Sequence, residues 1–269
     1  MRKGDRNLKA LQIDREAKVQ TWKEEETYAF RGWDFSHLDG RWEGEQQPWS
    51  YREVVERYLK PSDKLLDMGT GGGEFLLSLG HDPKLCSVTE GWEENYQLCL
   101  ETLAPMGITV NKLDEEFDFS LDFPDESFDI VLNRHESLNA DEVFRVLKKG
   151  GVFITQQVGG QNDRDLIEKL VGKFVPEFAW NDLSNTQADH AAVGFEILKA
   201  EESFTPLRFF DTGALVFFAK VINWEFHDFN VDACLPALET IDREIAENGY
   251  IEGTEHRFLL VAKKPASAE

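Results

Sequence analysis

The chain has 269 residues, of which 41% are hydrophobic, so it suits one large domain, or one domain with additions, and excludes disorder throughout. Its net charge of −22 and its scattered basic residues disfavour nucleic-acid binding, since phosphate backbones would be repelled. Cys86, Cys99 and Cys234 have no metal-ligand spacing, and no run has the length and apolar character of a signal peptide or membrane span. We therefore expect a cytoplasmic protein without a metal site, a membrane contact or a nucleic-acid partner.

Residues 1–48 form a charged segment that is rich in aromatic residues. We expect a helical lid that closes over a small-molecule site, although the same rings could instead pack the segment onto a sheet edge. A larger domain is expected over residues 49–269. The aromatic residues in and next to the lid segment are Trp22, Phe30, Trp33, Phe35, Trp42 and Trp49.

The larger domain opens with a predicted helix that begins after Ser50, its N-cap, and ends before Pro61. Strands and helices then alternate, which is typical of parallel βαβ units in a doubly wound α/β sheet. Strands are expected at 64–69, 86–91, 108–113, 128–133 and 152–158, and helices at 73–80, 93–107, 139–151 and 164–174. Two strands (195–204 and 256–264) and two helices (214–223 and 235–249) follow, partly as additions at about 180–250.

The first of these strands ends at Asp67, and a cluster of glycines follows it. A triphosphate-binding loop would need a lysine after the glycines, and none is present. A dinucleotide-binding loop would need a third glycine where Glu74 or Leu76 stands, and Glu74 would repel a pyrophosphate. The pattern that remains is D-x-G-x-G-x-G, whose bare backbone suits a ligand without phosphate.

This pattern resembles motif I of the class I S-adenosylmethionine-dependent methyltransferases. Two further blocks resemble the same superfamily, "LDFPDESFDIVLNRHE" and "EVFRVLKKGGVFITQQ", so the likeness covers roughly residues 60–160 and extends to uncharacterised bacterial members. It implies a Rossmann-like seven-stranded sheet in the order 3-2-1-4-5-7-6 with an antiparallel strand 7, for which residues 256–264 are the candidate.

The resemblance also implies a set of residues around S-adenosylmethionine. Asp67 would meet the cofactor's ammonium group or cap the loop backbone, and Glu90 would hold the ribose hydroxyls. Trp92 would stack on adenine or pack under the second helix, and the adenine amino group would be held by Asp118 or Asp114. The full set of expected cofactor contacts is Asp67, Gly69, Thr70, Gly71, Gly73, Glu90, Gly91, Trp92, Asp118 and Asn133.

The reaction expected from this resemblance is in-line methyl transfer to a small-molecule acceptor. His135 is the candidate general base, or else a residue that holds its loop in shape. Arg134 would bind an acidic substrate or pair with a local carboxylate. Alternatives are a non-catalytic S-adenosylmethionine-binding regulator, an RNA or protein methyltransferase, and a nicotinamide dehydrogenase, which Glu74 disfavours. The acceptor and the oligomeric state are left open.

Overall fold

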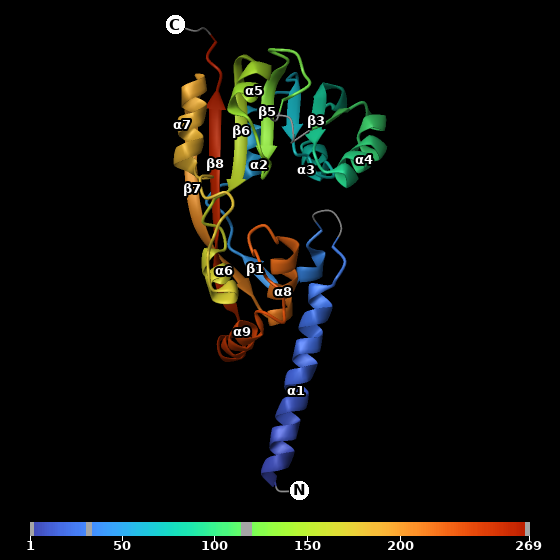
Figure 1. Ribbon diagram of the computed structural model, residues 1–269. Coiled ribbons are helices and arrows are strands. Elements are labelled where there is room, and N and C mark those ends of the chain that lie inside the picture. Colours follow the sequence, from blue (N-terminus) through green and yellow to red (C-terminus); the bar gives the residue numbers. More distant parts are fainter. Residues whose placement is uncertain (1–2, 31–33, 114–119, 267–269) are drawn as a thin grey trace. The chain divides into compact units, whose positions relative to one another are not determined.

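The computed structural model describes residues 3–30, 34–113 and 120–266, and its elements are labelled in Figure 1. The chain forms two compact units. The larger unit comprises Gln46–Gly160, Phe178–Phe204 and His256–Glu269, and the smaller unit comprises Met1–Glu45, Gln161–Glu177 and Thr205–Glu255.

The larger unit contains the predicted alternation of strands and helices. Its helices are α2 (Tyr51–Tyr58), α3 (Glu74–Ser78), α4 (Glu93–Thr102), α5 (Ala140–Val146) and α7 (Leu183–Val193), with 3-10 turns η2 (Pro83–Leu85) and η3 (Ala104–Met106). Its strands are β2 (Leu65–Met68), β3 (Cys86–Glu90), β4 (Thr109–Lys112), β5 (Phe128–Arg134) and β6 (Leu147–Val158), together with parts of β7 (Glu196–Phe209) and β8 (Ile251–Lys263).

The strands follow the order β1-β7-β8-β6-β5-β2-β3-β4. Strands β4, β3, β2, β5 and β6 pair in parallel, and β8 pairs antiparallel with β6. The doubly wound α/β class and the antiparallel strand at residues 256–264 are therefore confirmed. The prediction of seven strands differs in detail, because β1 (Trp42–Gly44) adds an eighth by pairing antiparallel with β7.

Both faces of the sheet in the larger unit are covered by apolar packing. Leu65 and Ile130 lie in a cluster with residues of α2, α3 and α4, whereas Leu66 and Val131 lie in a second cluster with residues of α5 and α7. Neighbouring residues of one strand thus face opposite sides, as the pleat of a strand requires. A polar ligand can then reach this sheet at the strand ends and their loops.

One predicted helix is shorter than the sequence indicates. Its signals extend to Gly150, but α5 ends at Val146 and β6 begins at Leu147. Leu147 pairs with Phe128 of β5, and Lys264 Nζ donates to the Leu147 carbonyl over 2.8 Å. Strand pairing and this lysine therefore override the local helix preference.

The smaller unit is built around the buried helix α8 (Thr212–Val221), against which α1 (Lys3–Glu26) and α9 (Leu235–Asn248) pack (Figure 1). It also holds η1 (Ser36–Leu38), β1 and α6 (Arg164–Val171). Several aromatic residues noted in the sequence pack in its core, namely Trp22, Phe30, Phe35 and Trp42. Trp49 belongs to the larger unit and Trp33 lies outside the described residues. Closure of residues 1–48 as a lid stays a prediction.

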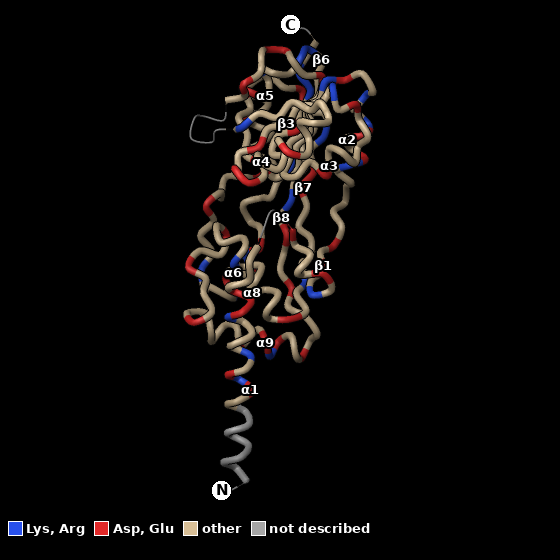
Figure 2. The backbone as a smooth tube through the Cα atoms, turned by 90° about the vertical axis from the view of Figure 1, so that its right-hand side faces the viewer, with Lys and Arg blue, Asp and Glu red and all other residues tan. Residues whose placement is uncertain are grey.

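Acidic residues outnumber basic ones, 51 to 29, and Figure 2 shows the two kinds interspersed along both units. None of the described helices combines the length and the apolar content that crossing a membrane requires.

Candidate functional site

The turn between β2 and α3 depends on glycines in the left-handed backbone region. Gly69, Gly71 and Gly73 have φ values of +64°, +62° and +84°, which residues with a Cβ rarely adopt. A Cβ on Gly69 would lie 2.5 Å from Glu136 Cβ, and one on Gly73 would lie 2.8 Å from the Leu103 methyl carbons. Packing within the protein therefore requires these two glycines.

Gly71 differs, because a Cβ on it would meet no heavy atom of the described residues within 4 Å. Its N–H donates to Glu90 Oε2 over 2.8 Å, and its carbonyl accepts from the Cys99 thiol over 3.1 Å. The peptide is thus held in place while the side of the missing Cβ stays open. A ligand can lie directly against such backbone.

Asp67 is the second-to-last residue of β2, and its carboxyl group is buried, with the residue 5% exposed. Burial raises its pKa to about 6, an effect that the Thr70 hydroxyl and the charge of Arg134 oppose and that the charge of Glu90 increases. The Thr70 hydroxyl donates to Asp67 Oδ2 over 2.7 Å. Asp67 therefore caps its own loop and, when ionised, gains from a cation placed beside it.

Glu90 lies at the end of β3, the strand next to β2, and is also buried. Its Oε2 accepts from the Gly71 N–H, and its Oε1 accepts from the Trp92 N–H over 3.0 Å. Both carboxylate oxygens of Glu90 are therefore oriented by backbone donors. Asp67, Gly71 and Glu90, three predicted cofactor contacts, are thus brought together.

Of the remaining predicted contacts near β3 and β4, the structure describes Gly91 and Trp92 but not the acid expected at the adenine amino group. Gly91 follows Glu90 directly, and Trp92 is the N-cap residue of α4 with a side chain that is 43% exposed. The helix does not bury this ring, which suits stacking by one face. Asp114 and Asp118 lie outside the described residues, so the acid at the adenine amino group stays a prediction.

At the end of β5, Asn133 is fully buried in a hydrogen-bond network. Its Oδ1 accepts from Thr155 Oγ1 (2.9 Å) and Gln157 Nε2 (2.5 Å), and its carbonyl accepts from the Tyr51 hydroxyl (3.2 Å). Its Nδ2 has no hydrogen-bond partner among the described residues, and neither has the buried Thr89 Oγ1. Most buried polar atoms have a partner, so an ordered water or a ligand at these two atoms would satisfy them.

Arg134 is the last residue of β5, and His135 is the first residue after it. The Arg134 guanidinium lies 5.8 Å from the ring centres of Tyr51 and Phe75. No ion pair joins it to an acid within residues 12–30, 34–113 and 120–266, so the predicted pairing with a local carboxylate is not formed there. His135 has φ +60°, which is uncommon for a residue with a Cβ.

The His135 ring contacts the buried side chain of Gln156, which sequence reasoning missed. Gln156 Nε2 lies 3.1 Å from His135 Nε2, and Gln156 Oε1 accepts from Trp49 Nε1 over 2.8 Å. The surrounding protein lowers the pKa of His135, and the positive charges of Arg257 and Arg134 lower it further. The lowered pKa keeps the ring neutral at pH 7, although the residue as a whole is exposed to solvent.

Glu136, which the sequence indicated only as a residue that holds this loop in shape together with His135, also borders the site. Its side chain lies against Gly69, so it borders the glycine turn from the loop after β5. The available signal for Gln156 was a pair of glutamines at the end of an otherwise apolar strand.

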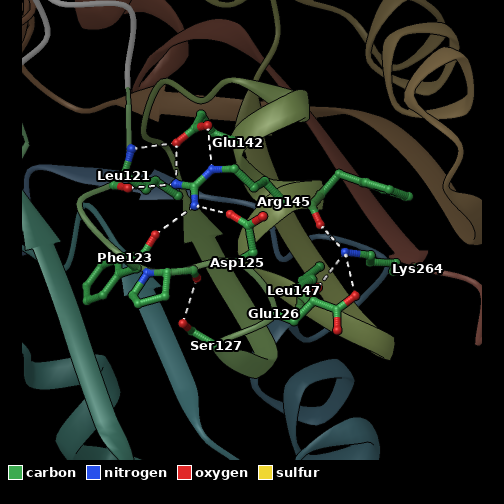
Figure 3. Close-up of polar contacts among 11 residues, drawn as sticks. Leu121, Phe123, Asp125, Glu126, Ser127, Glu142, Arg145, Leu147 and Lys264 are labelled. Atoms are coloured by element: carbon green, nitrogen blue, oxygen red, sulfur yellow. Dashed lines mark hydrogen bonds and ion pairs between the residues drawn. The ribbon is translucent and has the colours of Figure 1, made fainter.

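Arg145 of α5 lies in the third sequence block and forms hydrogen bonds with residues of the second block. Its guanidinium donates to the carbonyls of Leu121 (2.8 Å) and Phe123 (2.7 Å), and to the carboxylates of Asp125 and Glu142 (Figure 3). Glu142 in turn accepts from the Leu121 N–H over 2.8 Å. These two blocks therefore form a clamp that fixes the segment before β5.

Residues 66–155 match a family model described as "Methyltransferase domain". The matched stretch runs from β2 through the glycine turn into β6, so it includes Asp67, Gly71, Glu90 and Asn133. This stretch of the chain is therefore similar to a methyltransferase domain. A search of curated proteins finds no match to the chain.

Solved structures agree with this methyltransferase domain at the level of the fold. A candidate methyltransferase from Bacillus halodurans C-125 is 18% identical, with a TM-score of 0.52, and the match covers 80% of this chain and 99% of that one. The YcgJ protein from Bacillus subtilis is 19% identical, with a TM-score of 0.53, over 81% of this chain and 98% of that one. At these low sequence identities, the two matches show a similar fold and no more.

The cofactor of a methyltransferase domain of this kind is S-adenosylmethionine, and the residues present suit it. The open backbone at Gly71 leaves room for a ligand, and the buried acids Asp67 and Glu90 flank it. The cofactor bears an ammonium group and hydroxyls, which such acids can bind, and it has no phosphate for them to repel.

Proposed function

We propose that the protein transfers the methyl group of S-adenosylmethionine to a small-molecule acceptor by in-line displacement. The observation that carries this proposal is the backbone at Gly71, where the side of the missing Cβ is open. The Gly71 N–H is bound by the Glu90 carboxylate, and the buried Asp67 lies near the end of the neighbouring strand. The cofactor supplies an already activated methyl group. The protein's own task is then to align the acceptor and to exclude water.

The residues of the glycine turn would hold the cofactor. Asp67 would face its ammonium group, and the Glu90 carboxylate would bind the ribose hydroxyls. Trp92, with nearly half of its side chain exposed, would stack on the adenine. Gly69, Thr70 and Gly73 shape the turn, since Gly69 and Gly73 have no room for a Cβ and Thr70 restrains Asp67.

The loop after β5 would meet the acceptor. Asn133 and Arg134 are the last two residues of β5, which pairs with β2, and His135 begins the loop after β5, where the cofactor's reactive end is expected. A small-molecule acceptor is favoured over RNA, because basic residues are dispersed among more numerous acids (Figure 2).

The test is calorimetric titration of the full-length protein with S-adenosylmethionine, its demethylated product and NAD. We expect both sulfur compounds to bind and NAD not to bind. A second step offers methyl-labelled donor in a cell extract and follows the label into small molecules. Binding of NAD alone would overturn the proposal. Binding without any transfer would favour a regulatory protein, and label confined to RNA or protein would favour a macromolecular acceptor.

A further inference from the structure

Three side chains of the larger unit form a hydrogen-bond chain that ends at the His135 ring. Trp49 Nε1 is 2.8 Å from Gln156 Oε1, and Gln156 Nε2 is 3.1 Å from His135 Nε2. Trp49 and Gln156 are buried, at 8% and 6% exposure. The backbone carbonyl of Gln156 also accepts a hydrogen bond from the His135 backbone N–H over 2.8 Å, so Gln156 contacts both the ring and the backbone of His135.

The direction of every bond in this chain follows from the indole group. An indole N–H can only donate, so the atom of Gln156 that faces Trp49 must be its oxygen. The other end of the amide is then the NH₂ group, which also donates. His135 Nε2 must accept, and the proton of the neutral ring is therefore on Nδ1.

We propose that Trp49, acting through Gln156, keeps His135 in the Nδ1–H form, so that His135 donates a hydrogen bond to an oxygen of the methyl acceptor instead of removing a proton from the acceptor. This inference rests on the proposed function. Trp49 and Gln156 are positioning residues in it. The ring nitrogen that a general base would use is already bound to Gln156.

The charges near His135 indicate which kind of oxygen it would meet. Arg134 directly precedes His135, and its guanidinium lies over the Tyr51 and Phe75 rings without an ion pair to an acid in the described part of the chain, although the chain as a whole carries a charge of −22. A guanidinium group and an Nδ1–H donor favour an anionic oxygen such as a carboxylate. An acceptor that carries a carboxylate and a nucleophile with its lone pair already available fits this arrangement.

The tautomer can be read directly by long-range ¹H–¹⁵N correlation on full-length protein labelled at histidine. Two other histidines supply internal references, because each binds a carbonyl, which only accepts. His81 Nε2 is 2.8 Å from Asp63 O, so it is the Nε2–H form, and His190 Nδ1 is 2.7 Å from Thr186 O, so it is the Nδ1–H form. The His135 signal is assigned by its loss in His135→Gln. We expect it to match the pattern of His190.

Two variants test the control by Gln156. In Gln156→Glu both side-chain oxygens accept, so His135 must donate from Nε2; its tautomer reverses and its pKa rises beside the new negative charge. In Trp49→Phe the amide is no longer held in one direction, and we expect a mixture of both ring forms. A wild-type His135 in the Nε2–H form would overturn the proposal, as would an unchanged tautomer in Gln156→Glu.

The preference for an anionic oxygen is tested with benzoate as the probe, added to protein loaded with the demethylated cofactor product. We expect benzoate to shift the His135 Nδ1–H signal, and benzamide, which is neutral, to shift it at least tenfold less. Equal shifts from both compounds, or none, would overturn the anionic assignment. Titration of the same sample with the cofactor separates the proposed function from the proposed tautomer. Failure to bind S-adenosylmethionine would refute the function, whereas the Nδ1–H form of His135 would still be supported by its own spectrum.

Discussion

Gly71 donates its backbone N–H to Glu90 Oε2 over 2.8 Å, which ties the glycine turn after β2 to the end of β3. The same carboxylate accepts the Trp92 N–H, so one buried acid fixes two loops. A buried carboxylate that accepts charge-assisted bonds from the backbone is held firmly in one orientation. The carboxylate is therefore oriented before any ligand arrives.

Gly71→Ala is expected to weaken S-adenosylmethionine binding at least tenfold while the protein stays folded. The new methyl group would enter the open space beside the turn, where the cofactor is expected to lie. The matched control is Gly80→Ala, because Gly80 has a similar φ of +66° and no atom within 4 Å of an added Cβ. Both variants incur the same backbone strain of about 1 kcal/mol. Equal affinity for the two variants by calorimetry would contradict the proposed site.

Glu90→Gln is expected to reduce cofactor affinity by at least tenfold, the effect of losing about 1.5 kcal/mol or more. A glutamine has one acceptor oxygen, so its NH₂ group would face the N–H of either Gly71 or Trp92. The control is Glu93→Gln, an exposed acid that pairs with Lys112 on the surface. Such an exposed pair contributes little to stability, and the control should bind normally. An unaffected Glu90→Gln would exclude Glu90 as a ribose ligand.

The glycine turn was predictable from sequence because its cause is local. A strand that ends at an acid and continues into alternating glycines needs left-handed backbone, and few residues other than glycine supply it. The capping of α2 by Ser50 and of α5 by Asn139 is equally local, and both bonds are present. Local chemistry thus identified the turn, the strands around it and the acids at their ends.

The features that could not be predicted depend on distant partners. Trp49 and Gln156 are 107 positions apart, and their bond depends on how α2 packs against β6. The early end of α5 likewise depends on Lys264 at the far end of the chain. Sequence patterns specify which face of an element is apolar, but they do not specify which two polar side chains meet once the sheet has formed.

Arg145→Lys is expected to lower the free energy of unfolding by about 2 kcal/mol, because a lysine cannot make the several directed bonds of the guanidinium. The segment from Leu121 to Asp125 would lose its anchor, and cofactor affinity should fall less than in Glu90→Gln. Urea unfolding measures the change. Arg164→Lys is the control, since Arg164 forms an exposed pair with Glu168 and should change stability by about 0.5 kcal/mol or less. Equal stability of the two variants would show that the clamp does not stabilise the fold.

Asp67→Asn is expected to stabilise the protein at pH 7 and to change its stability little at pH 4. In the unfolded chain Asp67 ionises near its usual pKa of about 3.9, and in the folded protein near 6. Between these values the folded state keeps a proton that the unfolded state has lost, so stability falls as pH rises through this window. The gain for the variant at pH 7 should be on the order of 2–3 kcal/mol. A wild-type-minus-variant difference that does not depend on pH would contradict the shift.

Cofactor binding should show the opposite pH dependence at the same residue. An ammonium group beside Asp67 would stabilise the carboxylate and lower its pKa, so binding near pH 6 releases a proton and affinity rises as pH increases from 5 to 7. Calorimetry in two buffers of different ionisation enthalpy measures the released proton. Thr70→Val removes the hydrogen bond that favours the charged form, so the midpoint should move to higher pH. Asp67→Asn should abolish the proton release, and release that persists in Asp67→Asn would assign it to another group and remove Asp67 from the ammonium site.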